Sequence, residues 1–528
     1  MAELMHWSRW GDPAHRTELP ESAWKLLELA FGPPRETPAV PFESLALSPP
    51  ALPPEVLSAF QELLGAGNVL LDDTARVQHT RGKSTPDLLK IRGGDLADAP
   101  DAVLRPGSHS DVTKVLELCA EHRVAVVPFG GGTSVVGGLA ARRDGFGGVV
   151  TLDMARLDRL VSVDKLAGVA TLEAGLLGPR AEELLAAEGF TLGHFPQSFE
   201  YASIGGFAAT RSSGQASSGY GRFDAMVVGL KVATPIGTLV LGSAPANAAG
   251  PDLRQLVLGS EGAFGVITEV TLRVHPVPDV RIYETWRFGS FAAGRDAMRK
   301  LTQDGLRPTV IRLSDEAETA INLAKPSEVG SSSTGGCLMV AGYEGAEEHV
   351  ARIRGAVTAE LTARGGEALG AEDGQQWADG RFHGPYLRDV LLDHGVLVET
   401  LETATFWSNM DALYSSVKSA IESSLSDQGT PAIVLCHISH VYETGASLYF
   451  TVAARQLDDP LSQWKKAKQA ASDAMIASGA TITHHHAIGR DHKPWFAQEI
   501  GPVGVDILRA VKGRVDPAGI LNPGVLIP

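Results

Sequence analysis

The chain has 528 residues, of which 44% are hydrophobic and 20% charged, and its formal net charge is -16. This length exceeds one typical domain, so two or three domains with an ample core are expected. The acidic balance argues against a nucleic-acid-binding surface, because such surfaces carry basic patches.

The cysteines and the first residues indicate where the protein works. Cys119, Cys337 and Cys436 lie far apart without CxxC spacing, so neither a disulfide framework nor a zinc knuckle is indicated. The opening MAELMHWSRWGDPAHR lacks the basic and apolar regions of a secretory signal, and no run of 18 apolar residues occurs. We therefore expect a reduced, cytoplasmic location and leave peripheral membrane contact open.

Residues 1–98 are predicted to form an N-terminal helical and proline-rich arm. Residues 21–31 (ESAWKLLELAF) have amphipathic helical periodicity, which resumes at 55–66 (EVLSAFQELLGA). Eight prolines stand from Pro33 to Pro54 and deny that stretch regular structure. We expect an extended arm that wraps a folded body; a disordered linker is the alternative.

After the arm, the pattern changes to short strands and helices, and residues 99–278 are predicted as one domain. The apolar runs VAVVPF (124–129), GVVTLDM (148–154) and GVATLEAG (168–175) predict strands, and GPRAEELLAAEG (178–189) predicts a helix. Many strands beside short helices favour an α+β fold over a doubly wound sheet.

A second domain is predicted over residues 279–490. PVPDVRIYETWRF (276–288) reads as an extended crossing between the domains, and KPSEVGSSSTGG (325–336) as a polar loop. The strands expected beyond this loop, separated by long amphipathic helices, are CLMVAGYEG, AIVLCHISHVY and ASLYFTVAAR. Residues 491–528 are expected to return to the first domain.

Three glycine-rich stretches each enter or leave a predicted strand. PFGGGTSVVGG (128–138) can turn backbone N–H groups toward a diphosphate, although it matches neither a Walker A loop nor GxGxxG. Small and hydroxyl residues at 195–227 allow close contact with a large flat ligand, and 259–276 runs from a glycine turn into a strand. Together they predict a dinucleotide groove, and the missing Rossmann fingerprint favours a flavin over a nicotinamide.

These loops resemble the FAD-binding segments of the vanillyl-alcohol-oxidase-like flavoproteins. Within that group the chain most resembles the alkylglycerone-phosphate (alkyl-dihydroxyacetone-phosphate) synthase family. The resemblance runs from HWSRWGD and PFGGGTS through GHFPQSFEYASIGGFAATRSSG, GSEGAFGVITE, PYLRD and ETLETA, and its most specific part combines IRLSD, YETGASLYF and HHH. It implies a PCMH-type FAD-binding domain with two subdomains, and a cap domain with an antiparallel sheet flanked by helices.

The resemblance also implies noncovalent FAD, because PFGGGTS carries no histidine where some relatives attach flavin covalently. The residues expected to cradle the pyrophosphate are Pro128, Phe129, Gly130, Gly131, Gly132, Thr133 and Ser134. Those expected to line the flavin are Gln197, Ser198, Phe199, Glu200, Tyr201, Ala202, Ser203, Gly205, Gly206, Thr210, Arg211, Ser212 and Ser213. Those expected on the adenosine side are Ser260, Glu261, Gly262, Ala263, Phe264, Gly265 and Val266. Asn522, in the ending LNPG, completes the cofactor-binding set.

The strand ASLYFTVAAR alternates, so that Ser447, Tyr449 and Thr451 share one face. Taken alone, this pattern favours an ordinary half-buried tyrosine. The resemblance instead places the family's proton-transferring tyrosine at Tyr449.

Residues 482–495 (ITHHHAIGRDHKPW) contain three consecutive histidines, His484, His485 and His486. An extended backbone would send the outer two to one side and the middle one to the other. Imidazole is a natural base near neutral pH, and His-x-His is also an acceptable pair of metal ligands. Because LCHISHVYETG lacks the GDGN motif of related metal-binding dehydrogenases, we predict no metal and assign the three histidines to acid–base catalysis. His492 is expected to be a solvated loop residue.

Three residues are candidates for substrate binding. By the resemblance, Arg312 in VIRLSD matches an arginine important for activity, and Arg388 in PYLRD is a candidate anion partner, with a surface salt bridge as the alternative. The family's substrate-binding arginine falls on His437, which offers at most one weaker, pH-dependent donor. This replacement and the LNPG ending favour the alternative function, an FAD-dependent oxidase or dehydrogenase of a hydroxy acid or alcohol.

The function that the resemblance implies is an exchange without net redox change. An FAD-dependent transferase would replace the acyl group of acyl-dihydroxyacetone phosphate by a fatty alcohol, as in ether-lipid synthesis. His486 or His485 would remove the C–H proton, and Tyr449 would assist proton transfer. A lipid-like small-molecule substrate, a low-polarity tunnel for its alkyl chain and a homodimer are implied as well, and no nucleic acid.

Overall fold

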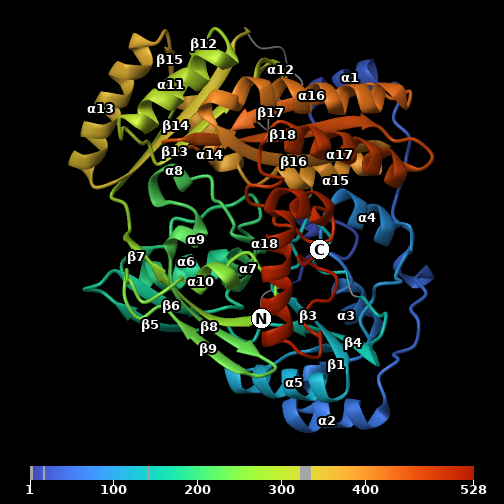
Figure 1. The fold of residues 1–528 in the computed structure, drawn as a ribbon. Coiled ribbons are helices and arrows are strands. Elements are labelled where there is room, and N and C mark those ends of the chain that lie inside the picture. Colours follow the sequence, from blue (N-terminus) through green and yellow to red (C-terminus); the bar gives the residue numbers. More distant parts are fainter. Residues whose placement is uncertain (1–3, 16–17, 141, 322–334) are drawn as a thin grey trace.

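The computed structural model describes residues 4–15, 18–140, 142–321 and 335–528 (Figure 1). Its strands form a four-stranded, a five-stranded and a seven-stranded sheet and a short two-stranded ribbon, with helices on their faces. This mixed order of strands and helices is the predicted α+β class. No described helix combines the length and the apolar character that a membrane crossing requires.

The first sheet is mainly parallel, in the order β1-β2-β4-β3. Its strands are β1 (Val69–Leu70), β2 (Ala102–Leu104), β4 (Gly148–Asp153) and β3 (Val124–Phe129). β3 and β4 are covered on both faces, which explains their continuous apolar runs. The helices around this sheet are α2 (Pro54–Leu64), α3 (Asp73–Gln78) and α5 (His109–Glu121), whereas α4 (Thr85–Arg92) packs against the third sheet, described below.

The second sheet is antiparallel, in the order β5-β6-β10-β8-β9. Its strands are β5 (Leu160–Asp164), β6 (Val169–Glu173), β10 (Val266–Arg273), β8 (Val227–Thr234) and β9 (Gly237–Leu241). The ribbon pairs β7 (Phe190–Thr191) with β11 (His275–Pro276). The helices of this region are α6 (Gly178–Ala187), α7 (Ile204–Thr210), α8 (Ser217–Tyr220), α9 (Phe223–Met226) and α10 (Arg254–Val257).

The third sheet, which we call the cap sheet, is antiparallel in the order β15-β12-β14-β13-β17-β18-β16. Its strands are β15 (Glu367–Gly370), β12 (Val280–Phe288), β14 (Cys337–Gly345), β13 (Val310–Ser314), β17 (Ala432–Ile438), β18 (Gly445–Arg455) and β16 (Val396–Phe406). The predicted crossing at 276–288 is therefore largely strand β12, and most of the predicted polar loop 325–336 lies outside the described residues.

Helices cover the outer face of the cap sheet and leave the face toward the other sheets for the site (Figure 1). The outer helices are α11 (Phe291–Gln303), α13 (Glu347–Ala363), α16 (Met410–Asp427) and α17 (Pro460–Ala477). The shorter helices α12 (Glu316–Ala320), α14 (Glu372–Gly380) and α15 (Gly384–Asp393) lie along the connections. Large apolar side chains such as Trp464 and Phe450 fill the space between the sheet and the outer helices.

The N- and C-terminal segments tie the sheets together. Helix α1 (Glu21–Phe31) matches the predicted helix, and the arm after it hydrogen-bonds to the cap side, from Arg35 N to His394 O and from Thr37 N to Asp393 O. The arm is thus extended and packed against the folded body, as predicted. Helix α18 (Lys493–Val515) leads back to the first sheet, where Leu521 forms a parallel bridge with Val126 (Figure 1).

Candidate active site

A cavity of about 480 Å³ is bounded by the three glycine-rich loops and by the open face of the cap sheet. Cofactor and substrate sites in proteins are commonly concave spaces of this size with a few convergent polar groups. Most of the predicted site residues meet here, although they come from segments hundreds of positions apart in the sequence.

The predicted cofactor residues divide into those that line the cavity and those behind it. The lining ones are Pro128, Phe129, Gly130, Gly131, Gly132, Thr133, Ser134, Gln197, Ser198, Ala202, Ser203, Gly205, Gly206, Thr210, Ser212, Ser213, Glu261, Gly262, Gly265 and Val266. The following described residues lie outside the lining: Phe199, Glu200, Tyr201, Arg211, Ser260, Ala263, Phe264 and Asn522. Asn522 instead joins two loops, because its Nδ2 donates to Gly138 O and to Glu261 O.

The first glycine loop fits the pyrophosphate of FAD. The N–H groups of Gly131, Gly132 and Thr133 have no protein acceptor in the described part of the chain. A Cβ on Gly131 would stand 1.5 Å from Tyr201 O, so the loop packs against the second glycine-rich stretch as only glycine can. Free, converging N–H groups in a tight turn form a site for an anion, which the diphosphate of a dinucleotide satisfies.

The strand register of the cap sheet brings four polar side chains into one row. His437 of β17 pairs with Tyr449 of β18, and Tyr449 pairs with Glu402 of β16. On the other side, His437 pairs with Ser314 of β13. Residues directly opposite in neighbouring strands share a face, so these four form a polar row across the sheet. Of the three residues that the alternation places on one face, Tyr449 and Thr451 line the cavity and Ser447 does not.

Glu402 holds the triple histidine in place. Its carboxylate accepts hydrogen bonds from the backbone N–H groups of His484 (2.5 Å), His485 (3.1 Å) and His486 (2.9 Å), and from the Thr483 hydroxyl. Three successive N–H groups reach one carboxylate only if the chain bends around it. The expected extended backbone is therefore wrong, and both His485 and His486 line the cavity.

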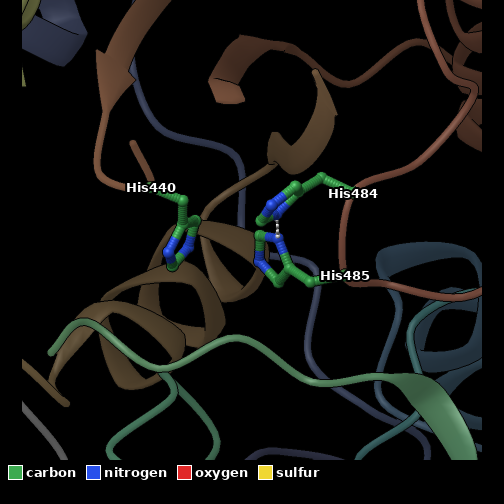
Figure 2. Close-up of side chains that lie close together, drawn as sticks. All are labelled: His440, His484 and His485. Atoms are coloured by element: carbon green, nitrogen blue, oxygen red, sulfur yellow. Dashed lines mark hydrogen bonds between the residues drawn. The ribbon is translucent and has the colours of Figure 1, made fainter. Parts of the chain in front are cut away.

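His440 joins the histidine cluster from the loop after β17 (Figure 2). One ring nitrogen of each of His440, His484 and His485 lies within 4.8 Å of the others, an arrangement that could hold a metal ion. Other contacts use part of this capacity, since Tyr442 Oη lies 2.5 Å from His484 Nε2 and Ser213 Oγ lies 3.0 Å from His440 Nδ1. The same geometry therefore serves a hydrogen-bonded acid–base cluster, and the absence of a metal stays a prediction.

Burial sets the protonation of these groups. It lowers the pKa of His484 and His440 well below the usual histidine value and that of His485 to about 3, so the imidazoles are neutral at pH 7. Burial raises the pKa of Tyr449 to about 12, which keeps its hydroxyl protonated. Burial alone would raise the pKa of Glu402. His485, the other two neighbouring histidines and Thr483 lower this pKa by more than burial raises it, so Glu402 is ionised.

The predicted substrate residues line the cavity but are already paired. Arg312 and His437 both contact the fully buried carboxylate of Glu318, with 3.1 Å between His437 Nδ1 and Glu318 Oε2. Burial, and then the charge of Arg312, lower the pKa of His437, so it is neutral. Arg388 pairs with Asp389 at 3.0 Å and donates to Lys83 O, in a salt bridge that is buried rather than on the surface.

One branch of the cavity lies between helix α1 and the cap sheet, and we call it the apolar arm of the cavity, as distinct from the N-terminal arm of the chain. It is bounded by Leu19, Ala23, Leu26, Leu27, Leu387, Leu391, Val398, Ile433, Leu435 and Ala453. Residues that the sequence placed in a wrapping N-terminal arm thus form one wall of the site. A long alkyl chain matches such a lining, because burying each CH₂ group contributes about 0.8 kcal/mol.

Several site residues were missed from the sequence. Glu402 lies in ETLETA, where an acidic residue inside an apolar strand run is a signal for a buried, paired carboxylate. His440 lies three residues after His437, and only the turn after β17 brings it to the triple histidine. The solvated position expected for His492 is wrong: its side chain is buried, and Nδ1 lies 2.8 Å from Ala487 O.

Comparison with known proteins agrees with this arrangement. Residues 100–242 match the family described as FAD binding domain, and residues 277–526 match the FAD linked oxidases, C-terminal domain. A solved alkyldihydroxyacetonephosphate synthase superimposes with a TM-score of 0.85 at 30% identity and covers 98% of both chains. Substrate-bound p-cresol methylhydroxylase shares the fold, with a TM-score of 0.68 at 17% identity over 91% of this chain and 98% of its own.

These matches confirm the PCMH-type FAD-binding domain, the antiparallel cap and FAD as the cofactor. The alkyldihydroxyacetonephosphate synthase of Dictyostelium discoideum is 34% identical over 514 residues, which cover 93% of this chain and 84% of that protein. The chain therefore belongs to the alkyldihydroxyacetonephosphate synthase family of FAD-linked flavoproteins.

Proposed function

We propose that this protein is an FAD-dependent transferase that exchanges the acyl group of acyl-dihydroxyacetone phosphate for a fatty alcohol. The observation that carries the proposal is the single cavity in which a dinucleotide cradle, a polar row with neutral histidines and an apolar arm meet. An enzyme that joins a long alkyl chain to a small polar ketone needs these three parts together.

FAD, held by the glycine loops, would supply an electron-accepting ring. Among the protein groups, His485 or His486 removes the C–H proton next to the ketone, because the side chains of both line the cavity. Glu402 holds the backbone of both histidines and stabilises the positive charge that proton uptake creates.

Tyr449 is suited to act as the acid. Its protonated hydroxyl can donate to the departing acyl oxygen and later receive a proton from the incoming alcohol. Its ring stacks on His437 with 4.8 Å between the ring centroids, and the ring centroids of His485 and His486 lie 6.1 and 5.7 Å from it. These contacts fix the direction in which the hydroxyl points.

The alternative function is an FAD-dependent oxidase or dehydrogenase of a hydroxy acid or alcohol. The observation that favours this alternative is that His437 is neutral and already hydrogen-bonded to Glu318, so His437 binds a phosphate weakly. The same tyrosine and histidines could deprotonate an alcohol during oxidation.

Anaerobic incubation of the FAD-loaded protein separates the two functions. With acyl-dihydroxyacetone phosphate and hexadecanol, the transferase releases fatty acid and forms the ether product while the flavin absorbance stays oxidised. Stable bleaching of the flavin by a hydroxy acid or an alcohol, without ether formation, would contradict the proposed exchange.

The assembly and location of the protein belong to the same proposal. We propose noncovalent FAD, a cytoplasmic homodimer and peripheral contact with a membrane through α1. This helix lines the apolar arm with Leu26 and Leu27 and exposes 86% of Leu29. A lipid-like substrate could then pass from the bilayer into the cavity over a short path.

A further inference from the structure

Arg381, in the short link between α14 and α15, lines the cavity and was not among the residues expected to bind substrate. Its guanidinium carbon lies 4.8 Å from the ring centroid of Phe195 and 5.1 Å from that of Phe382. Two of its nitrogens, Nε and Nη1, are buried without a hydrogen-bond partner. Because these two nitrogens are buried, Nη2 is the nitrogen of Arg381 that can face the cavity.

The other arginines that line the cavity are neutralised by carboxylates. Arg312 contacts Glu318 and Arg388 contacts Asp389, although Arg312 Nε is also without a partner. In the part of the chain that the structure describes, Arg381 has no carboxylate within salt-bridge distance. It therefore adds a net positive charge to a cavity whose remaining arginine charges are balanced.

The position of Arg381 relates it to the histidine cluster. Gln215 Nε2 donates to Arg381 O at 3.2 Å, and Gln215 lies two residues after Ser213, whose hydroxyl lies 3.0 Å from His440 Nδ1. Gln215 and Ser213 thus connect the backbone of Arg381 with the segment that contacts His440. The contacts of the guanidinium with two aromatic rings limit its rotation.

We propose that Arg381 binds the anionic group of the substrate, a phosphate monoester, through its guanidinium. A guanidinium forms charge-assisted hydrogen bonds with phosphate oxygens. The identity of the substrate rests on the proposed function, whereas the anion site rests on the geometry of Arg381.

The test measures binding to the FAD-loaded protein by isothermal titration calorimetry, with dihydroxyacetone phosphate and inorganic phosphate as probes. In Arg381→Gln, we expect the dissociation constant for dihydroxyacetone phosphate to rise about 10- to 100-fold, because charge-assisted hydrogen bonds are lost. Arg381→Lys, which keeps the charge without the planar guanidinium, should show a smaller rise. Binding of inorganic phosphate should weaken in the same order.

Arg352→Gln, at an exposed position on α13, is the matched control and should bind both probes like the wild type. The flavin spectrum and FAD content of each variant show whether Arg381 acts on the cofactor instead. Unchanged probe affinity in Arg381→Gln, with or without a change in the flavin, would overturn the inference, as would a wild-type protein that binds neither probe. Arg381-dependent phosphate binding without ether formation would overturn the proposed exchange and leave the anion site standing.

Discussion

At the scale of single residues, the site depends on one buried carboxylate. Glu402 is 3% exposed and accepts hydrogen bonds from three consecutive backbone N–H groups and from a hydroxyl. The backbone of the three histidines is therefore held at one point, and the rings of neighbouring histidines contact each other. A base fixed in this way loses little entropy when the substrate arrives.

We expect Glu402→Gln to lower kcat for ether formation about 10- to 100-fold and the free energy of unfolding by about 2–4 kcal/mol. The amide removes the negative charge and places N–H donors against the backbone N–H groups of the loop. Steady-state kinetics and urea unfolding measure the two effects. Glu367→Gln, at an exposed position on β15, is the control. Wild-type kinetics in Glu402→Gln would mean that the loop keeps its shape without this residue.

The histidine cluster also allows a direct test for a metal. We expect the purified protein to contain no stoichiometric zinc, manganese or iron and to keep its activity after dialysis against EDTA. The imidazole nitrogens are engaged with Tyr442, Ser213 and Ser217 instead. Elemental analysis of wild type and His440→Ala decides the question. A metal that is present at one equivalent and lost in His440→Ala would make the cluster a ligand set.

At the scale of elements, the cap sheet and helix α1 together define which molecules can enter the cavity. The polar row crosses four strands whose order in the sheet, β13-β17-β18-β16, differs from their order in the chain. Helix α1 closes the apolar arm from the other side. The cap sheet thus carries the polar side chains, and helix α1 bounds the space for an alkyl chain, so each can be altered separately.

Ala23→Trp should narrow the apolar arm without touching the polar row. Ala23 is 3% exposed and faces the arm from α1, so the indole would occupy space needed by an alkyl chain. We expect KM for hexadecanol to rise at least about 10-fold, while a short alcohol such as butanol reacts as before. Leu29→Trp, on the exposed side of the same helix, is the matched control. Equal losses for both alcohols would show that this wall does not select chain length.

The sequence predicts those features that depend on residues close together in the chain, and it does not predict those that depend on residues far apart. Strands β3, β14 and β18 follow from local apolar patterns, and the glycine loops follow from composition. The alignment of His437, Tyr449 and Glu402 depends on strand register, which no local pattern encodes. In the same way, the hydrogen bond from Arg388 to Lys83 O and the burial of Arg381 depend on tertiary contacts. The division at residues 98, 278 and 490 stays a prediction.

At the scale of the whole molecule, buried histidines couple folding to pH. Burial lowers the pKa of His194, His485 and His492 to about 3. The unfolded chain binds protons at these side chains below about pH 6.5, whereas the folded chain does not, so their contribution to stability is full above that pH and is lost as pH falls toward 3. Glu261 acts in the opposite direction, because burial raises its pKa to about 7.

We expect His194→Gln to lose less stability on acidification than the wild type. Between pH 6.5 and pH 5, one histidine with so low a pKa accounts for about 2 kcal/mol of the loss. Urea unfolding of the FAD-loaded protein at pH 7.5, 6.5 and 5 measures the difference. His122→Gln, on the surface, should follow the wild type at each pH. Parallel curves for all three proteins would contradict the assignment of His194 as a buried neutral group.

The clamp formed by Asn522 has a consequence for biosynthesis. Its amide joins Gly138 O to Glu261 O, and the neighbouring Leu521 pairs with β3. Because residue 522 follows both glycine loops in the chain, its two hydrogen bonds can join the loops only after both have been synthesised.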